Sequence, residues 1–205
     1  ARGVDVIDLG AGDADLAPPP RVLETIGSAV HQPPMNRYGF GLGLVQFREA
    51  TSAWMQKRFG FKADPLKEIV PLIGSKEGLA NLAQAITSPG DIILVPNPSY
   101  PIHMFGFIIA GASVRSLPPV APGGSFLEVL ERAVRHSVPK PTALVLNYPS
   151  NPTAEVVDLD FYRPIVEFCR QHGILVQGFL GRMQPERSPE ELEHLKATLV
   201  DTLRR

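Results

Sequence analysis

The residues best suited to chemistry in this sequence follow apolar segments. Asn151 lies in residues 147–153, Asn-Tyr-Pro-Ser-Asn-Pro-Thr, directly after the apolar run 142–146, which predicts a buried parallel strand. Pro149 and Pro152 fix the backbone on either side of Asn151 and remove two backbone donors. Ligands of open α/β folds bind at the carboxyl ends of strands, so we expect Asn151 to direct a hydrogen bond to a ligand. The alternative is a turn asparagine that bonds its own backbone.

A second stretch, Gly-Ser-Lys-Glu-Gly at residues 74–78, stands between a predicted strand (68–73) and a predicted helix. The amides at a helix N-terminus are free and the helix dipole is positive there, so this turn favours an anion such as phosphate. Ser75 can add a hydroxyl. The spacing differs from that of the phosphate loop of nucleotide triphosphatases, and an ordinary capped helix is the alternative.

Tyr100 lies in a third stretch, Pro-Asn-Pro-Ser-Tyr-Pro at residues 96–101, after the predicted strand 91–95. A tyrosine held between prolines at the end of a strand can stack on a flat heteroaromatic ring. A core tyrosine with a satisfied hydroxyl is the alternative.

Two glycine-rich segments precede these stretches. Gly10 and Gly12 follow the short predicted strand 4–9 and allow the backbone to approach another group closely, although a plain glycine turn fits equally. Residues 36–43 contain a G-x-G-x-G pattern but lack the preceding strand that a dinucleotide fingerprint requires.

Strand and helix patterns alternate along the chain, which predicts an α/β fold with a parallel-rich sheet and helices on both faces. Further strands are expected at 112–117 and 173–176, and helices at 18–30, 44–58, 79–86, 98–110, 126–133 and 160–172. Residues 188–205 predict a C-terminal amphipathic helix, because Ser188 can cap it and four leucines share one face: Leu192, Leu195, Leu199 and Leu203.

Composition excludes several classes of function. The 205 residues carry 20 Lys and Arg against 21 Asp and Glu without a basic block, so we expect no nucleic acid and no membrane surface as partner. The single cysteine, Cys169, forms no internal disulfide and no cysteine-built metal site. No apolar run approaches the length of a membrane span and no signal peptide is evident, so a soluble, cytoplasmic protein is expected.

Taken together, five ordered motifs resemble the class I/II aminotransferases, which are fold-type I enzymes that use pyridoxal 5'-phosphate (PLP). The LL-diaminopimelate and aspartate/alanine-type members are closest in pattern, and the resemblance covers residues 4–176. The motifs are Gly10-x-Gly12-Asp13, Arg37-Tyr38-Gly39 and the segments 74–78, 96–101 and 147–153.

The resemblance implies a role for each motif. Ser75 and Lys76 would bind the cofactor phosphate, Tyr100 would stack on the pyridine ring and Asn151 would donate to the phenolic oxygen of the ring. Tyr38 would reach the phosphate in the partner subunit of a homodimer, and Gly12 would lie against the substrate carboxylate. The substrates would be an amino acid and a 2-oxo acid, whose side chains the sequence does not specify.

The chain departs from the family after residue 176. The pattern expects a carboxylate that pairs with the pyridinium nitrogen, where Gln177, Gly178 and Phe179 stand, and it then expects the Schiff-base lysine within a Ser-x-Ser-Lys segment. None of the lysines lies in such a segment, so no catalytic residue is assigned. Two functions therefore remain open: an incomplete or internally deleted aminotransferase, and a non-catalytic remnant that binds PLP or phosphate or that dimerises.

This interpretation predicts three segments. Residues 1–35 form an N-terminal segment, residues 36–180 a portion of the PLP-binding large domain, and residues 181–205 the C-terminal helix of a small-domain remnant.

Overall fold

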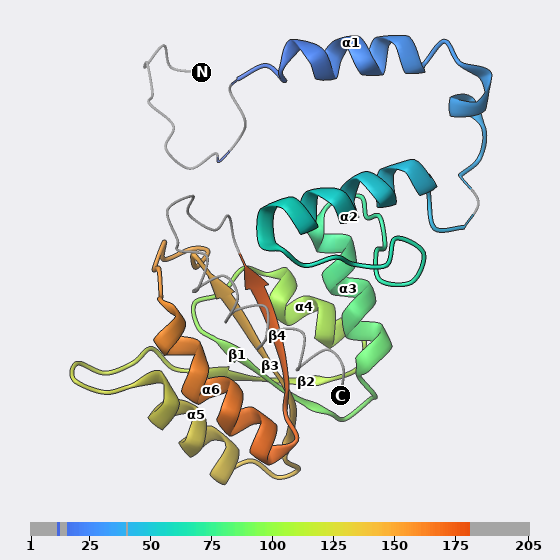
Figure 1. Ribbon diagram of the computed structural model, residues 1–205. Coiled ribbons are helices and arrows are strands. Elements are labelled where there is room, and N and C mark those ends of the chain that lie inside the picture. Colours follow the sequence, from blue (N-terminus) through green and yellow to red (C-terminus); the bar gives the residue numbers. More distant parts are fainter. Residues whose placement is uncertain (1–11, 13–15, 40, 181–205) are drawn as a thin grey trace, which may run out of the picture. The chain divides into compact units, whose positions relative to one another are not determined.

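The computed structural model describes residue 12, residues 16–39 and residues 41–180 (Figure 1). The chain divides into two compact units, Ala1–Leu44 and Val45–Arg205. The first unit contains the helix α1 (Pro20–Ala29) and a short 3-10 helix, η1 (Pro33–Asn36). Proline is the first residue of α1, where its missing N–H leaves no hydrogen bond unmade.

The second unit begins with the helix α2 (Val45–Phe59). Two buried polar side chains of α2 hold the loop that follows it. Arg48 Nη1 donates to the carbonyl of Pro65 at 3.0 Å, and Ser52 Oγ donates to the carbonyl of Ala63 at 2.6 Å. These bonds satisfy carbonyls of the loop that have no strand or helix partner.

A four-stranded parallel sheet forms the centre of the second unit (Figure 1). Its strands are β1 (Ile92–Pro96), β2 (Ser113–Leu117), β3 (Pro141–Tyr148) and β4 (Leu175–Leu180), in the spatial order β2-β1-β3-β4. The chain leaves β1 toward β2 on one side and then crosses to β3 on the other side. The strand order therefore reverses between β1 and β3, and in open α/β sheets that point is where a crevice forms for ligands.

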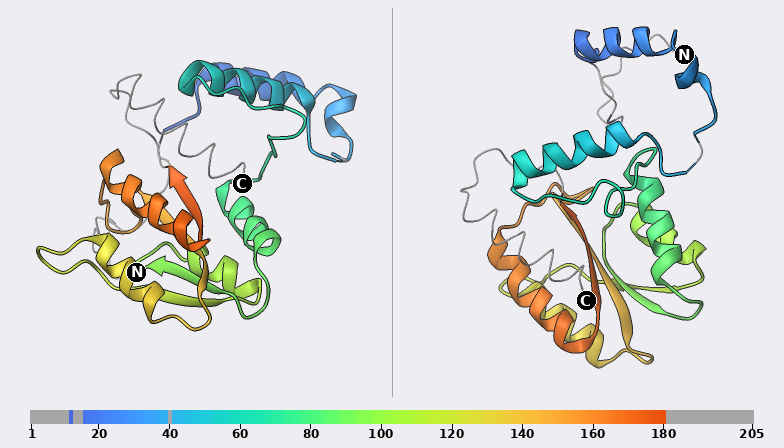
Figure 2. Two further views of the ribbon diagram at one scale, coloured as in Figure 1. Left: turned by 60° about the horizontal axis from the view of Figure 1, so that its bottom comes forward. Right: turned by 45° about the vertical axis from the view of Figure 1, so that its right-hand side comes forward.

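Helices cover both faces of the sheet (Figures 1 and 2). On one face, α3 (Ser75–Ile86) and α4 (Ile102–Ile109) cover Ile93, Val95 and Val145. On the other face, α5 (Phe126–Arg135) and α6 (Leu159–His172) cover Leu94, Leu144 and other buried residues. Successive side chains of a strand point to opposite faces, so the continuous aliphatic runs of β1 and β3 fill both cores.

Local signals in the sequence explain where two of these helices begin or end. At the start of α5 the hydroxyl of Ser125 accepts from the amide of Glu128, and the Glu128 carboxylate accepts from the amide of Ser125, which is a complete capping box. Asp158 caps α6 by accepting from the amide of Phe161, and Gly173 ends α6 in a left-handed conformation with φ of +68°.

The predicted fold class is confirmed: the sheet is parallel and helices lie on both faces. Several predicted boundaries differ, two of them for a clear reason. The helix expected at 98–110 begins at Ile102, because Pro98 and Pro101 restrict the residues before it, and the strand expected at 173–176 begins at Leu175, after the Gly173 turn. The strand expected at 68–73 is wrong: among the described residues no strand lies beside this segment to supply hydrogen bonds, and Val70 and Ile73 are exposed.

Two predicted elements, the strand at 4–9 and the helix at 188–205, lie outside the described residues. The predicted segment boundaries after residues 35 and 180 stay predictions. Among the helices that the structure describes, none has both the length and the apolar composition needed to cross a membrane.

Candidate functional site

The N-terminus of α3 presents free backbone amides. Gly74 precedes the helix with φ of +84°, a conformation that glycine adopts without strain, and it supplies no side-chain cap. Within the described residues Ser75 makes no side-chain hydrogen bond, so its hydroxyl is available beside the amides of the first turn. Glu77 also lies in this turn, but its carboxylate accepts from the backbone amide of Ile73. The helix end can therefore accept an anion.

Tyr100 lies beside this helix end. It follows β1 in the proline-rich loop that leads into α4, and its side chain is half-buried. The ammonium nitrogen of Lys76 lies 5.3 Å from the centre of the Tyr100 ring. A cation at this distance from an aromatic face is attracted to the ring by its quadrupole. Lys76 and Tyr100, which are 24 positions apart in the sequence, thus come together. They belong to the predicted phosphate-binding stretch 74–78 and the predicted aromatic stretch 96–101.

Two neighbours of Tyr100 were missed by reasoning from the sequence. His103 is only 3% exposed, and its Nδ1 lies 2.8 Å from the Oγ of Ser99. Its ring meets the Tyr100 ring edge to face, with centroids 5.9 Å apart. Burial lowers the pKa of His103, so the ring is neutral at pH 7. The available signal was the spacing of Ser99 and His103, four residues apart at the start of a helix that is otherwise apolar.

Asn151 lies in a turn after β3. The amide of Ser150 donates to the carbonyl of Glu155, and the amide of Ala154 donates to the carbonyl of Ser150, each at 2.8 Å. Asn151 itself is exposed, and its side chain forms no hydrogen bond to any residue that the structure describes. The turn is therefore closed by backbone bonds, without a bond from the Asn151 side chain to its own backbone.

The loop that carries Asn151 is anchored through Tyr148. The Tyr148 ring packs edge to face against Phe161 and Tyr162 of α6, at centroid distances of 5.0 and 6.2 Å. Burial, with smaller contributions from the charges of Glu155 and Tyr162, raises the pKa of Tyr148 to about 12. Its hydroxyl stays neutral, and the aromatic contacts fix the end of β3 against α6.

The sheet brings these loops to one edge. β1 and β3 are hydrogen-bonded neighbours, with Leu94 paired to Leu144, so the Tyr100 and Asn151 loops both leave the sheet at its carboxyl end. This edge is the point where the strand order reverses. An anion-binding helix end, an aromatic ring and a displayed amide are the groups that a phosphorylated heteroaromatic ligand requires.

Comparison with known proteins decides the family. The profile of the family described as aminotransferase class I and II matches residues 4–177. The chain belongs to this family. The predicted resemblance is thereby confirmed, and the aminotransferases of this family depend on PLP.

Several relatives are similar over most of this chain. Identity is 51% over 176 residues with AatC of Rhizobium meliloti (strain 1021), 45% over 175 residues with the glutamate-pyruvate aminotransferase AlaC of Escherichia coli (strain K12), and 40% over 175 residues with the LL-diaminopimelate aminotransferase of Moorella thermoacetica. The matches cover 85–86% of this chain but 42–45% of the relatives. The chain thus spans less than half the length of the curated relatives it matches.

A solved structure agrees with the same assignment. The aromatic aminotransferase from Pyrococcus horikoshii OT3 superimposes with a TM-score of 0.76 at 26% identity, over 91% of this chain and 51% of that one. The family profile ends at residue 177, which is where the sequence departs from the expected pattern. The backbone of Phe179 pairs with that of Asn147 at the carboxyl end of β4, where the family pattern expects the carboxylate.

Tyr38 and Gly12 belong to the Ala1–Leu44 unit. Tyr38 is 88% exposed, and a side chain at Gly12 would meet no atom of the described residues within 4 Å. The roles of both residues stay predictions, as do those of Ser75, Lys76, Tyr100 and Asn151.

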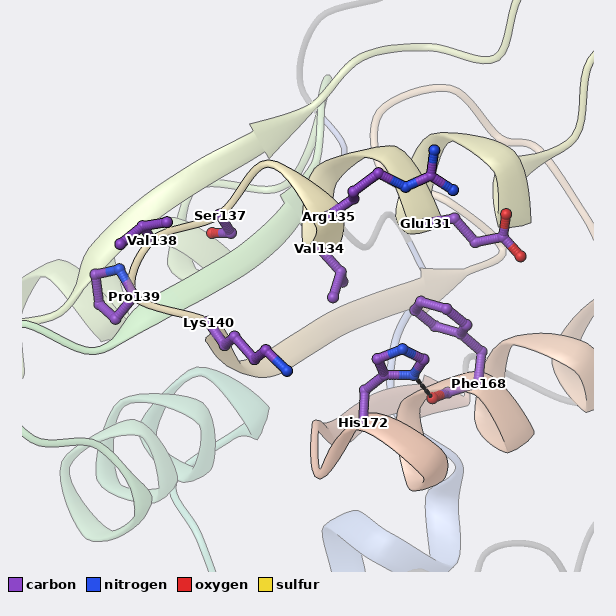
Figure 3. Close-up of a pocket in the computed structure, with 9 residues that line it drawn as sticks. All are labelled: Glu131, Val134, Arg135, Ser137, Val138, Pro139, Lys140, Phe168 and His172. Carbon is purple, nitrogen blue, oxygen red and sulfur yellow. Dashed lines mark hydrogen bonds between the residues drawn. The ribbon is translucent and has the colours of Figure 1, made fainter.

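A cavity of about 620 Å³ lies elsewhere, between the C-terminal ends of α5 and α6 (Figure 3). Its basic side chains include Arg135, Lys140 and His172, and it contains none of the predicted site residues. Arg135 stands in the last turn of α5, where its positive charge complements the negative end of the helix dipole. The cavity therefore lies apart from the residues that the family resemblance assigns to the site.

Proposed function

We propose that this chain forms the cofactor-binding portion of a PLP-dependent aminotransferase, which transfers an amino group between an amino acid and a 2-oxo acid. The observation that carries the proposal is the meeting of Lys76 with Tyr100, 5.3 Å apart, at the carboxyl edge of the sheet. Membership of the class I and II family supports it.

Each residue of this edge fits one part of the cofactor. The first-turn amides of α3, with the Ser75 hydroxyl and the Lys76 ammonium, suit the phosphate. The ring of Tyr100 suits the face of the pyridine, and the amide of Asn151 can donate to the phenolic oxygen. Bound PLP supplies an electron sink for the amino acid, and the protein residues bind and orient it.

Binding is tested most clearly with pyridoxamine 5'-phosphate, because its amine cannot condense with lysines. Calorimetry with the 205-residue chain should show binding of pyridoxamine 5'-phosphate, weaker binding of inorganic phosphate, and weaker binding still of pyridoxamine without the phosphate. Equal dissociation constants for pyridoxamine with and without its phosphate would contradict the proposed phosphate site.

The chemistry of the 205-residue polypeptide should stop at binding. The chain contains no segment resembling that of the Schiff-base lysine, and Phe179 stands where a carboxylate is expected. General-base catalysis contributes roughly 10²- to 10⁴-fold to enzymatic rates, so its loss leaves little turnover. Incubation with PLP, an amino acid and 2-oxoglutarate should yield no glutamate above a protein-free control. Turnover near 10 per second, the approximate enzyme median, would show that a lysine such as Lys76 acts as the base.

The proposal includes a two-fold dimer in the cytoplasm. Tyr38 is exposed in a glycine-rich segment and the family resemblance assigns it to the neighbouring subunit, so the site would be shared across an isologous interface. Sedimentation at micromolar concentration should give a discrete dimer mass. A strictly monomeric species, or a continuous range of aggregates, would count against this part of the proposal.

A further inference from the structure

His103 is a buried polar residue next to the proposed cofactor site. It is the second residue of α4, whose other members are apolar or glycine, and it is 3% exposed. A buried imidazole destabilises the fold unless its nitrogen atoms find hydrogen-bond partners. A phenylalanine would fill the same space and would need no hydrogen-bond partner. Packing alone therefore does not explain why a histidine is buried at this position.

Three contacts of His103 are with the loop that carries Tyr100. Its backbone amide donates to the carbonyl of Tyr100 at 3.0 Å, its Nδ1 lies 2.8 Å from Ser99 Oγ, and its ring meets the Tyr100 ring edge to face. Pro98 and Pro101 flank Ser99 and Tyr100 and have no backbone N–H. The loop therefore has few backbone donors that could hold its conformation. The bond between Ser99 and His103 therefore closes the loop onto α4.

We propose that His103, by its hydrogen bond to Ser99, is a positioning residue that holds the Tyr100 ring in place for the pyridine ring of the cofactor. This inference rests on the proposed function. The Tyr100 ring contacts both the His103 ring and the Lys76 ammonium. Its orientation therefore affects both the part of the site proposed for the pyridine ring and the part proposed for the phosphate. A neutral imidazole suits this place, since a second cation there would repel Lys76.

Three variants separate the hydrogen bond from the volume of the side chain. Ser99→Ala removes the partner hydroxyl, and His103→Gln carries its amide one bond beyond the position of Nδ1. His103→Asn is the rescue variant, because its amide is attached to Cγ as Nδ1 is, and it can reach Ser99. A variant remote from the site, Ser113→Ala on the edge strand β2, is the control.

The measurement compares how much each variant weakens the binding of two ligands, pyridoxamine 5'-phosphate and inorganic phosphate, by calorimetry. We expect Ser99→Ala and His103→Gln to weaken pyridoxamine 5'-phosphate binding about five- to tenfold, the worth of one hydrogen bond. The affinity for inorganic phosphate should stay within twofold of the wild type, because the phosphate contacts α3 and not the Tyr100 ring. His103→Asn and the control should bind both ligands like the wild type. Equal losses of affinity for both ligands would show that His103 only stabilises the fold, and would overturn the inference.

A second measurement decides the matter without ligand. The ring signals of Tyr100 in ¹³C-tyrosine-labelled protein, assigned with Tyr100→Phe, should shift in Ser99→Ala and His103→Gln and return to the wild-type position in His103→Asn. Unchanged ring signals in Ser99→Ala would refute the positioning role. If the wild type binds phosphate but not the pyridine compound, the proposed function fails, and the ring signals still show whether His103 positions Tyr100.

Discussion

The two ends of the same parallel sheet differ in which helix termini lie there, and the size of a cavity does not reveal this difference. At the carboxyl end the N-terminus of α3 faces Tyr100, and Asn151 is displayed by a turn. At the amino end lies a cavity of about 620 Å³, bordered by the C-termini of α5 and α6. The helix dipole is positive at the first end and negative at the second. In the cavity Arg135 complements the negative end of α5, whereas Lys76 adds to a charge that already favours an anion.

The largest expected effect comes from placing a carboxylate at each end. Ser75→Glu places a carboxylate at the N-terminus of α3, where it competes with the phosphate for the same amides and repels it. Since charge-assisted hydrogen bonds contribute about 1.5–3 kcal/mol, pyridoxamine 5'-phosphate affinity should fall about thirtyfold or more. Calorimetry gives the dissociation constants.

The matched control is Lys140→Glu at the amino end, a charge change of the same sign in the cavity. It should leave the affinity for pyridoxamine 5'-phosphate within twofold of the wild type. If Lys140→Glu were the more damaging of the two, the ligand would bind at the amino end and the comparison would be reversed.

A smaller effect is expected from the aromatic group alone. Tyr100→Ala removes the stacking surface, and because aromatic pairs contribute about 0.5–1.5 kcal/mol, it should weaken pyridoxamine 5'-phosphate binding roughly three- to tenfold. Inorganic phosphate has no ring, so calorimetry should give the same phosphate affinity for Tyr100→Ala and wild type. Tyr100→Phe keeps the stacking surface and should bind both ligands normally. A loss in Tyr100→Phe as large as in Tyr100→Ala would instead assign the contribution to the hydroxyl.

The carboxyl end was largely predictable because its groups follow from local patterns. Proline on both sides of Tyr100 and Asn151, directly after buried strands, was enough to place both residues at one edge of a parallel sheet. The contact between Lys76 and Tyr100 could not be predicted in the same way, since it depends on how α3 packs beside the loop after β1. The role of His103 could not be predicted for a related reason. A histidine in an apolar helix is expected to be a core residue, and only the structure shows its contact with Ser99.

The segment 68–73 shows the limit of strand patterns. Its aliphatic residues have strand propensity, but a strand exists only when a neighbour supplies hydrogen bonds, and no such neighbour lies among the described residues. In contrast, the aliphatic run of β3 is paired on both sides, by β1 and by β4. The two segments share aliphatic residues, but Pro71 removes a ladder donor from 68–73, and pairing is a property of the whole sheet.

The smallest expected effect concerns how firmly the carboxyl end is held, and it depends on pH. The pKa of Tyr148 is raised to about 12 in the folded chain, whereas a phenol in the unfolded chain titrates near 10. Between these values the unfolded chain loses its proton first, so the folded state binds more protons and the free energy of unfolding falls as pH rises. The stabilisation is complete below pH 10 and disappears as pH approaches 12. Because Tyr148 is half-buried and solvent screens its surroundings, we expect a loss of no more than about 1 kcal/mol at pH 11.

Tyr148→Phe isolates this contribution. Cys169 is buried as well, with its pKa raised to about 12, and it lowers stability at high pH in the same direction, but it is present in both proteins. Urea unfolding at pH 9 and pH 11 should therefore show a smaller loss of stability for Tyr148→Phe than for the wild type. The phenylalanine keeps the ring contacts with Phe161 and Tyr162, so both proteins should be similarly stable at pH 9. An equal loss in the two proteins would show that the Tyr148 hydroxyl is as exposed as in the unfolded chain, and that the Asn151 loop is not anchored to α6.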